Sequence, residues 1–453
     1  MQHILLRNRE IPDIGKFDVY VQNSGYEGLR NALAMMPDAV IAQVKDSNLR
    51  GRGGAGFPTG MKWSFVPKIE GPKYVAVNAD ESEPGTFKDR EILEKNPHAL
   101  IEGALICGYA IQATAVYIYC RGEFWDLAHN IEAEIEKARA AGWVGKNIGG
   151  KEWSCEVYIH LGAGAYICGE ESALLNSVEG KLGQPRPRPP FPAVAGLYAR
   201  PTVINNVETL ASVPFIMVNG AAAYKAVGTE KSPGTKIFCM SGHVTNPGNY
   251  ELPLGTTFRE LIYTHAGGIA NGKKLKAILP SGASGPLLAA TDKVLDTPLT
   301  YEDVGALGSV LGSASMILLD EDTDMVWAAH RMSQFFRHES CGKCTPCREG
   351  TYWLEKKMDG IVNKRATAAD VKLLEDVAVQ MQGKNLCALG DFATSPVLSS
   401  LKLFRDEYMK YVSADPTKPA AKAAAAAVDK PIVAARTSPK TAPAAAPVPA
   451  SGD

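Results

Sequence analysis

The sequence predicts an α/β protein: a Rossmann-like domain, then a small β-grasp (ubiquitin-like) α+β domain, then a C-terminal helical bundle. Three observations predict this order. Strands alternate with helices over residues 1–230, which favours a parallel sheet covered on both faces. Short strands and turns fill residues 231–323. Helical apolar spacing, with a cluster of cysteines, runs through residues 324–411.

The first domain shows its elements in a regular order. Helical apolar spacing runs from Gly25 to Val44, and a proline-rich connector over Lys181–Pro192 should be extended. The segment Pro201–Val218 returns the chain to this domain. The predicted strands are Tyr74–Asn78, Ala115–Cys120 and Ser154–Leu161, and further helices are predicted from Lys88, over Leu127–Ala141 and from near Glu170. Ligands of such sheets bind at the carboxyl ends of strands, so the loops after these strands should form a site.

The later segments differ from the first domain in their predicted secondary structure and composition. A strand at Lys236–Ser241, a turn at Asn246–Asn249, a short helix from Thr257 and a strand at Ser315–Leu319 indicate the β-grasp module. In the helical segment the apolar residues Met325, Ala328, Ala329 and Met332 share one face. Residues 412–453 are dominated by Ala, Pro, Lys, Ser and Thr, so this tail should be disordered.

Composition excludes several classes of protein. Lys plus Arg number 48 and Asp plus Glu 49, so the chain lacks the basic excess of a general nucleic-acid binder. The apolar run at the N-terminus is too short for a signal peptide. The apolar stretch Ala104–Cys120 falls short of a spanning helix and is interpreted as a helix followed by a buried strand. We therefore expect a cytosolic protein that reaches a membrane only through partners.

The strongest chemical signal is a cysteine cluster. Cys341, Cys344 and Cys347 follow at two-residue spacing, and Cys387 comes from a separate segment. Four thiolates in this pattern suit a [4Fe–4S] cluster. A zinc site is one alternative, but it is usually built from two separated C-x-x-C pairs. The other alternative is that the four cysteines are unrelated buried thiols. The other cysteines, Cys107, Cys120, Cys155, Cys168 and Cys239, are scattered among apolar residues and predict plain buried thiols.

A glycine-rich loop, Gly51-Arg52-Gly53-Gly54-Ala55-Gly56, contains the pattern G-x-G-x-x-G. A dinucleotide fingerprint needs a strand before the glycines, whereas Ile41–Leu49 is predicted as a helix running into a loop. The loop can still bring backbone amides close to a phosphate or a flat ring. Phe57, Lys62, Trp63 and Phe65 follow it and suit base stacking and phosphate pairing; a flexible surface loop is the alternative.

Two more loops follow predicted strands. Asn78, Asp80, Glu81 and Glu83 can accept hydrogen bonds from ribose or ribityl hydroxyls and would repel a 2′-phosphate, although a solvated acidic turn would look the same. The second loop, Gly162–Glu171, fits a tight strand-to-helix turn, with Tyr166 either in the core or against a ring system. Glycine loops, aromatic residues and a thiolate cluster together suggest a flavin, which converts a hydride into single electrons.

Five motifs carry a resemblance to a known family. They are Gly51–Trp63, Asn78–Thr86, Gly162–Glu171, Asn205–Thr209 and Glu339–Gly350. In this order, over residues 5 to 411, the sequence resembles the flavin-bearing, NADH-oxidising F subunit of bacterial NADH:quinone oxidoreductase, respiratory complex I. The family often has Lys where this chain has Arg188, so the charge is kept but the geometry differs.

The resemblance implies FMN, NADH and one [4Fe–4S] cluster on Cys341, Cys344, Cys347 and Cys387. The implied FMN contacts are the loop residues Gly51, Arg52, Gly53 and Gly54, together with Lys62, Asn78, Asp80, Ile204, Asn205, Asn206 and Thr209. Phe57, Phe65 and Phe191 would pack around the adenine. Glu83 and Glu171 would hold ribose or nicotinamide groups, while Tyr166 and Glu81 would lie near the flavin ring. Gly169 and Glu170 complete the implied cofactor-binding set. Glu81, Tyr166 and Glu171 would be catalytic in the sense of positioning.

The resemblance also implies partners and a location. The partners would be a thioredoxin-like [2Fe–2S] subunit and the large iron–sulfur subunit of the peripheral arm. The chain would lie on the cytoplasmic side, peripheral to the inner membrane. The diaphorase subunit of an NAD-reducing hydrogenase or formate dehydrogenase shares these motifs, but commonly carries an extra N-terminal [2Fe–2S] domain, whereas the first cysteine here is Cys107. A non-enzymatic interaction module with decayed loops is the third hypothesis, and the intact glycines and acids speak against it.

Overall fold

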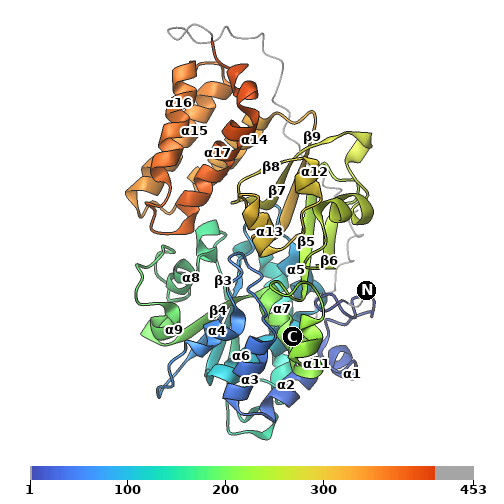
Figure 1. Ribbon diagram of the computed structural model, residues 1–453. Helices are drawn as coiled ribbons and strands as arrows, with labels where there is room; N and C mark the ends of the chain where they lie inside the picture. Colours follow the sequence, from blue (N-terminus) through green and yellow to red (C-terminus); the bar gives the residue numbers. More distant parts are fainter. Residues whose placement is uncertain (1–2, 414–453) are drawn as a thin grey trace, which may run out of the picture.

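The computed structural model describes residues 3–413 and contains two sheets and a helical bundle (Figure 1). The four-stranded sheet is parallel with the order β3-β2-β1-β4, and its strands are β1 (Tyr74–Ala79), β2 (Ala115–Cys120), β3 (Glu156–Leu161) and β4 (Thr202–Asn206). The strand order reverses between β1 and β4. Ligands of open α/β sheets bind at such a point, outside the carboxyl ends of the strands. The predicted parallel sheet is confirmed.

The first part of the chain, which contains this sheet, also has eleven α-helices within the described residues. They are α1 (Phe17–Gln22), α2 (Glu27–Leu33), α3 (Pro37–Asp46), α4 (Thr59–Ser64), α5 (Lys88–Lys95), α6 (Pro97–Ile111), α7 (Trp125–Ala140), α8 (Glu171–Val178), α9 (Pro192–Ala195), α10 (Val207–Ala211) and α11 (Val213–Lys225). The interpretation of residues 104–120 as helix then strand is confirmed by α6 and β2. The single helix expected over Gly25–Val44 is wrong, because Pro37 cannot continue a helix and instead begins α3.

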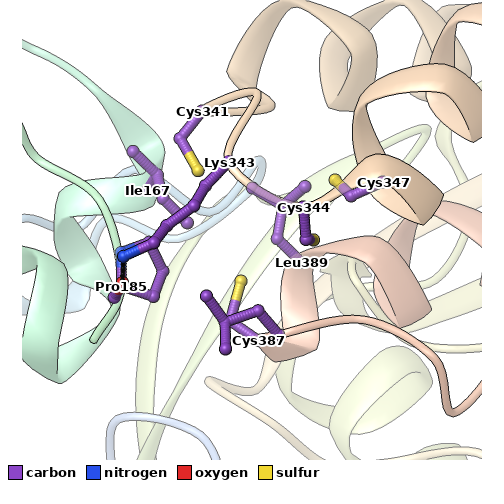
Figure 2. A pocket seen from close by; sticks show the side chains of 9 residues that line it. Ile167, Pro185, Cys341, Lys343, Cys344, Cys347, Cys387 and Leu389 are labelled. Carbon is purple, nitrogen blue, oxygen red and sulfur yellow. Dashed lines mark hydrogen bonds between the residues drawn. The ribbon is translucent and has the colours of Figure 1, made fainter. Parts of the chain in front are cut away.

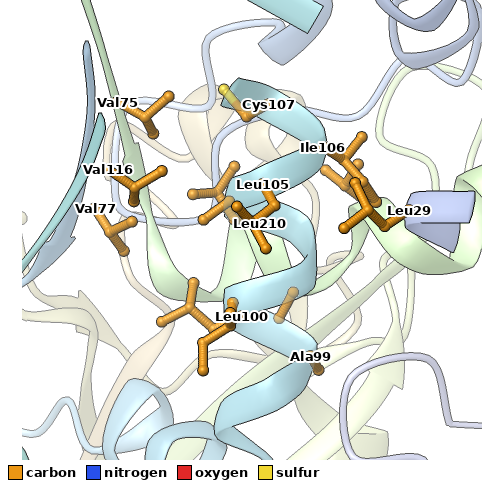
Figure 3. Close-up of a cluster of buried hydrophobic side chains, with 14 of the residues drawn as sticks. Leu29, Val75, Val77, Ala99, Leu100, Leu105, Ile106, Cys107, Val116 and Leu210 are labelled. Atoms are coloured by element: carbon orange, nitrogen blue, oxygen red, sulfur yellow. The ribbon is translucent and has the colours of Figure 1, made fainter. Parts of the chain in front are cut away.

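The core of this part lies on one face of the sheet. All residues of α6 are buried, and Leu100 and Leu105 pack toward Val75 and Val77 of β1 (Figure 3). The other face is only partly covered, by α8 against β1 and by α9 against β4. Tyr158 of the edge strand β3 stays 45% exposed, so the expectation of helices over both whole faces is wrong at this edge.

The second sheet has five strands in the order β6-β5-β9-β7-β8. They are β5 (Thr235–Gly242), β6 (Gly248–Pro253), β7 (Leu275–Ala283), β8 (Leu288–Ala289) and β9 (Ser315–Asp320), with the short helices α12 (Asp292–Leu295) and α13 (Tyr301–Ala306). Strands β5 and β9 pair in parallel at the centre, and the other pairs are antiparallel. The predicted strands in this segment and the mixed α/β class are confirmed.

The bundle consists of α14 (Met325–Glu339), α15 (Thr345–Val362), α16 (Ala368–Met381) and α17 (Ala388–Met409). It lies beside the five-stranded sheet, and both sit against the four-stranded part (Figure 1). Val412 is buried and Thr367 forms a β-bridge with Ser413, so a tail that starts at residue 412 is wrong by two residues. The remainder of the predicted tail, 414–453, lies outside the described residues. No helix within 3–413 is long and apolar enough to span a bilayer.

A buried charge network joins the two sheets. Lys88 Nζ lies 2.8 Å from Asp89 Oδ1, 2.9 Å from Glu208 Oε2 and 3.2 Å from Asn206 Oδ1. Lys236 of β5 reaches the same Glu208 Oε2 at 3.0 Å. Burial lowers the pKa of Lys236 to about 8. Buried charges persist only when they are paired, so the network fixes the five-stranded sheet against α5 and α10.

Candidate functional site

A cavity of about 500 Å³ opens at the carboxyl ends of β1 and β4, where the strand order reverses. Three parts of the chain line it: loops of the four-stranded part, loops of the five-stranded sheet and the start of α17. The lining residues are Gly53, Gly54, Ala55, Asn78, Asp80, Glu81, Ser82, Glu83, Thr86, Lys88, Asp89, Tyr166, Ile167, Gly169, Glu170, Asn206, Ser284, Val310, Gly312, Ser313, Cys387, Ala388, Leu389 and Phe392.

The glycine loop forms one wall. A Cβ on Gly53 would lie 2.8 Å from Asn206 Cβ, so only glycine permits this approach, whereas a Cβ on Gly54 would meet nothing within 4 Å. Gly54 therefore faces open space. The loop is held from behind, because Arg52 N donates to Thr209 Oγ1 at 2.8 Å. Since no strand precedes the loop, it is no Rossmann phosphate turn, but its bare backbone fits a phosphate or a ring.

The end of β1 forms the base. Asn78 Nδ2 donates to the Gly169 carbonyl oxygen at 2.7 Å, and Asp80 N donates to Asn78 Oδ1 at 3.1 Å. A Cβ on Gly169 would lie 3.1 Å from Asp80 Oδ2. Burial raises the pKa of Asp80 to about 7. The buried Asp80 carboxyl can accept hydrogen bonds from hydroxyl groups of a ligand.

Glu83 connects the two sheets across the cavity. Its Oε2 accepts a hydrogen bond from Tyr166 Oη at 2.7 Å, and its Oε1 accepts one from Ser284 N at 2.9 Å. Ser284 follows β7. Burial raises the pKa of Glu83 to about 7. Both oxygens are thus fixed in direction, and their remaining lone pairs can accept from a diol.

Glu81 lines the cavity and also caps the helix α5. Its carboxylate accepts from Asp89 N at 2.6 Å and from Arg90 N at 2.8 Å, the free amides in the first turn of α5. Burial, reinforced by the charge of Asp89, raises the pKa of Glu81 to about 8. Glu81 therefore fixes the start of α5, and with it Lys88, relative to the cavity.

The start of α8 carries a cluster of four charged side chains. Glu170 caps the helix by accepting from Ser172 N and Ala173 N, and Arg188 Nη2 pairs with its Oε1. Glu171 pairs with Lys62 Nζ and with Arg188 Nη2, each at 3.1 Å. Although burial alone would raise it, Lys62 and Arg188 hold the pKa of Glu171 below its usual value. Glu171 therefore stays ionised in the neutral range.

Aromatic side chains expose their rings beside the glycine loop. The rings of Phe57 and Phe65 lie with centroids 6.1 Å apart, and both are about half exposed. Phe191, after the proline-rich connector, is also exposed. Phe57 and Phe65 form an exposed pair of rings, and stacking on a nucleobase fits such rings. Trp63, in contrast, is fully buried and donates its Nε1 hydrogen to Asn205 Oδ1 at 2.8 Å.

The four predicted cysteines surround one small cavity (Figure 2), which Ile167, Pro185, Lys343, Leu386 and Leu389 complete. Burial raises the pKa of Cys347 to about 11 and that of Cys387 to about 12. Four thiols from two segments around one space, closed by apolar side chains, match the ligand set of a [4Fe–4S] cluster. The iron ions would supply the positive charge that ionises these thiols.

The two cavities adjoin. Ile167, Cys387 and Leu389 line both, so a single layer of side chains separates them. Whatever occupies the larger cavity therefore lies next to whatever the cysteines bind.

Comparison with known proteins agrees with this arrangement. Residues 44–215 match the family model of the Nuo51 FMN-binding domain, and residues 327–411 match the NADH-ubiquinone oxidoreductase-F iron–sulfur binding region. Residues 237–286 match the SLBB domain. The F subunit of the NADH-quinone oxidoreductase of Streptomyces coelicolor is 54% identical over 397 residues, covering 87% of this chain and 88% of that protein. The chain belongs to the family of NADH-quinone oxidoreductase F subunits.

Other relatives support the assignment. The F subunit of Mycobacterium tuberculosis is 54% identical over 86% of this chain and 88% of its own length, and the F 2 subunit of Rhizobium meliloti is 50% identical over 90% and 97%. The structure of an NAD⁺-reducing [NiFe]-hydrogenase superposes with a TM-score of 0.77 at 40% identity, over 83% of this chain. This chain spans 63% of that longer hydrogenase chain. The family resemblance, the FMN-binding domain and the [4Fe–4S] region are thus confirmed.

Not every predicted cofactor residue of this family member reaches the cavity. Arg52 turns its fully buried side chain away and donates to Tyr224 Oη and the Pro233 carbonyl oxygen. Thr209 supports the glycine loop by accepting from Arg52 N, and Asn205 accepts from Trp63 Nε1 of α4. The predicted residues that do line the cavity are Gly53, Gly54, Asn78, Asp80, Glu81, Glu83, Tyr166, Gly169, Glu170 and Asn206. The predicted residues outside its lining are Gly51, Arg52, Phe57, Lys62, Phe65, Glu171, Phe191, Ile204, Asn205 and Thr209.

Several lining residues carry no signal in the sequence that would place them in a site. Ser284, Val310 and Ser313 belong to the segment of the five-stranded sheet, and no motif marks them as close to β1. Lys88 also lines the cavity. Lys88 lies in the first turn of α5, where the helix dipole disfavours a positive charge. This unfavourable placement is the sequence signal that could have indicated a special role for Lys88.

Proposed function

We propose that the large cavity of this chain binds FMN, and that NADH docks over it between Glu83 and the exposed aromatic rings. The chain oxidises NADH with FMN and transfers electrons through iron–sulfur chemistry, as its family and its two cofactor regions indicate. The observation that carries the assignment of the cavity is its shared wall with the cysteine site, formed by Ile167, Cys387 and Leu389. Bound FMN accepts a hydride and returns single electrons.

The residues divide into holders of the flavin and holders of the nicotinamide nucleotide. Gly53 and Gly54 offer backbone to the flavin phosphate or ring, while Asn78 and Asp80 accept from ribityl hydroxyls. Gly169 keeps the floor clear, since a side chain there would meet Asp80. Phe57, Phe65 and Phe191 suit the adenine ring, and Glu83 and Glu171 suit the hydroxyl and amide groups of NADH.

No side chain has to form a covalent bond or donate a proton in this scheme. Tyr166 and Ser284 fix the carboxylate of Glu83, and Glu81 fixes α5 under the cavity. Holding two reactants in one geometry is a large part of enzymatic rate enhancement. Glu81, Tyr166 and Glu171 therefore serve as positioning residues.

The proposed domain boundaries are drawn from the two sheets and the helical bundle. We place an FMN- and NADH-binding domain at residues 1–230, a β-grasp domain at 231–323 and a [4Fe–4S] domain at 324–413. The sheet order β6-β5-β9-β7-β8, with its first and last long strands parallel at the centre, supports the β-grasp assignment. Val412 and Ser413 join the last domain because they pack on it.

The partners proposed are a thioredoxin-like [2Fe–2S] subunit and the large iron–sulfur subunit of a complex I peripheral arm. The chain would lie on the cytoplasmic side of the inner membrane and touch it only through that complex. The names of the relatives support an assembly that reduces quinone. An NAD⁺-reducing hydrogenase is the alternative parent complex, because a chain of such a hydrogenase shares the fold at 40% identity.

An anaerobic absorbance titration with NADH tests the function. The chain is co-produced with its neighbouring subunits, and flavin and iron are quantified in the same sample. We expect flavin bleaching by NADH and about four irons per chain, as one cubane cluster requires. A flavin-free protein that contains zinc and ignores NADH would overturn both cofactor assignments. Quinone reduction by the purified assembly, compared with hydrogen-dependent NAD⁺ reduction, separates the two parent complexes.

A further inference from the structure

The glycine loop of the large cavity is held by two side chains from the segment that forms the five-stranded sheet. Tyr301, the first residue of α13, donates its Oη hydrogen to the Gly51 carbonyl oxygen at 2.8 Å. Lys236 of β5 donates from Nζ to the Arg52 carbonyl oxygen at 3.0 Å. Two consecutive carbonyl groups of the loop are therefore fixed by residues outside the segment 44–215, which matches the FMN-binding family model.

Each of these carbonyl groups belongs to a peptide unit whose amide points the other way. Both units are trans, so the C=O and N–H groups of each lie on opposite sides. In the first unit, Arg52 N donates to Thr209 Oγ1 at 2.8 Å, so this unit is held at both ends. In the second unit, Lys236 holds the carbonyl group, and the Gly53 amide has no hydrogen-bond partner within residues 3–413. Because Gly53 lines the large cavity, its amide is free to bind a ligand there.

The two donors are held in place by ion pairs. Lys236 is fully buried, and its Nζ lies 3.0 Å from Glu208 Oε2. The Cζ atom of Arg50 lies 4.3 Å from the centroid of the Tyr301 ring, and Arg50 pairs with Glu302, the next residue of α13. Neither donor can move freely, because an ion pair fixes the donor itself or the helix that carries it.

We propose that Tyr301 and Lys236 are positioning residues for the flavin, which turn the Gly53 amide into the large cavity to donate to bound FMN. A donor that is fixed before the ligand arrives loses little conformational entropy on binding. The ammonium group of Lys236 also polarises the peptide unit that carries the Gly53 N–H, which strengthens this donor. The inference rests on the proposed assignment of the large cavity to FMN, and it makes the five-stranded sheet a part of the flavin site.

The test removes one hydroxyl group from the full chain, co-produced with its neighbouring subunits. Tyr301→Phe loses the hydrogen bond to Gly51 but keeps the ring beside Arg50. The dissociation constant for FMN, measured by the fluorescence of released FMN on dilution, should rise about fivefold, the worth of roughly one hydrogen bond. The visible circular dichroism of the remaining bound flavin should change, because the loop beside it is less ordered. The melting temperature of the flavin-free protein should stay within about 3 °C of the wild type.

Tyr250→Phe is the matched control. Tyr250 of β6 also donates from Oη to a backbone carbonyl oxygen, that of Asn246, at the same distance of 2.8 Å. The control therefore loses the same kind of hydrogen bond in the same sheet, outside the glycine loop. Its FMN dissociation constant and flavin circular dichroism should match the wild type.

Two further variants test the second donor and the shared peptide unit. Lys236→Met leaves Glu208 paired with Lys88 and should raise the FMN dissociation constant about tenfold or more, because a charged donor is lost. Thr209→Val removes the other hold on the peptide unit that Tyr301 binds. The double variant Tyr301→Phe/Thr209→Val should therefore fall short of the product of the two single fold-changes, and independent effects would contradict a shared unit.

Two results would overturn the inference. One is a wild-type dissociation constant for FMN in Tyr301→Phe, whether or not Lys236→Met folds. The other is an equal rise in Tyr250→Phe, which would show that the loss of any such hydrogen bond in the sheet loosens the flavin. In both cases a wild-type protein that binds FMN and is bleached by NADH leaves the proposed function standing, whereas a wild-type protein that binds no FMN would refute that function itself.

Discussion

Replacing Lys88 by Met should loosen the FMN cavity by breaking the buried charge network beneath it. The lysine is 1% exposed and its Nζ holds Asp89 Oδ1, Glu208 Oε2 and Asn206 Oδ1 within 3.2 Å. Although burial alone would lower it, Asp89 and Glu208 hold the pKa of Lys88 above its ordinary value. Without the ammonium group, Glu208 keeps Lys236 as its cation, whereas Asp89 loses the cation with which it pairs within residues 3–413.

The size of the effect follows from this burial. Removing one partner of a buried pair costs about 3–5 kcal/mol, because the other charge stays buried and unpaired. For a domain of this size the loss corresponds to a fall of roughly 6–20 °C in the melting temperature. Asn206, which lines the cavity, also loses a hydrogen-bond donor, so FMN should dissociate more readily.

The assay is thermal unfolding followed by circular dichroism and by flavin fluorescence, at fixed protein and flavin concentrations. The exposed Lys95 on the same helix provides a control, and Lys95→Met should shift the midpoint by only a degree or two. The double variant Lys88→Met/Asp89→Asn should recover part of the loss, since it removes the unpaired carboxylate. A melting temperature for Lys88→Met within two degrees of the wild type, with additive double-variant effects, would refute the reasoning.

Three further predictions concern other parts of the site. The Glu83→Gln side chain keeps only one acceptor oxygen for the two donors Tyr166 Oη and Ser284 N. The KM for NADH should therefore rise about tenfold, which corresponds to roughly one charged hydrogen bond, and the KM for NADPH should change less. If the variant's kinetics with both nucleotides were the same as those of the wild type, Glu83 would not belong to the site. Burial raises the pKa of Asp80 to about 7. Between about pH 4 and pH 7 the folded flavin-free chain therefore keeps a proton on Asp80 that the unfolded chain has already released. The resulting contribution to stability is lost as the pH rises through 7. Asp80→Asn should therefore stabilise the flavin-free chain at pH 8 and not at pH 4, and parallel pH profiles of unfolding for both proteins would contradict this. Truncation after Ser413 should leave NADH-dependent flavin reduction intact in absorbance titrations, while loss of bleaching would show that the tail is needed.

Local chemistry was predictable from sequence because it depends on short spacings. The cysteine triplet, the glycines after the helix and the acids after a strand each carry their meaning within a few residues. The interpretation of residues 104–120 as a helix followed by a strand is confirmed, because the β-branched and aromatic run Ala115–Cys120 forms β2 after α6 ends at Ile111. The break at Pro37 was missed, although proline at the first position of a helix is its ordinary place.

Only the tertiary structure decided which side chains share a space. The contacts of Lys62 and Arg52 are examples: Lys62 pairs with Glu171, and Arg52 donates to Tyr224 Oη, which no short motif indicates. Ser284 and Ser313 reach the cavity because the loops that follow β7 and precede β9 lie beside the end of β1, and this long-range packing has no local sequence signal.

The sequence by itself determined the family of this protein, its cofactors and the type of most of its elements, and it predicts the flavin and cluster ligands, because motifs and periodicity are local properties of the chain. The tertiary structure decided the geometry: the common wall of Ile167, Cys387 and Leu389, the orientation of Glu83 by Tyr166 and Ser284, and the buried network around Lys88. Such contacts join residues far apart in sequence, and their position depends on how whole sheets and helices pack rather than on any single segment.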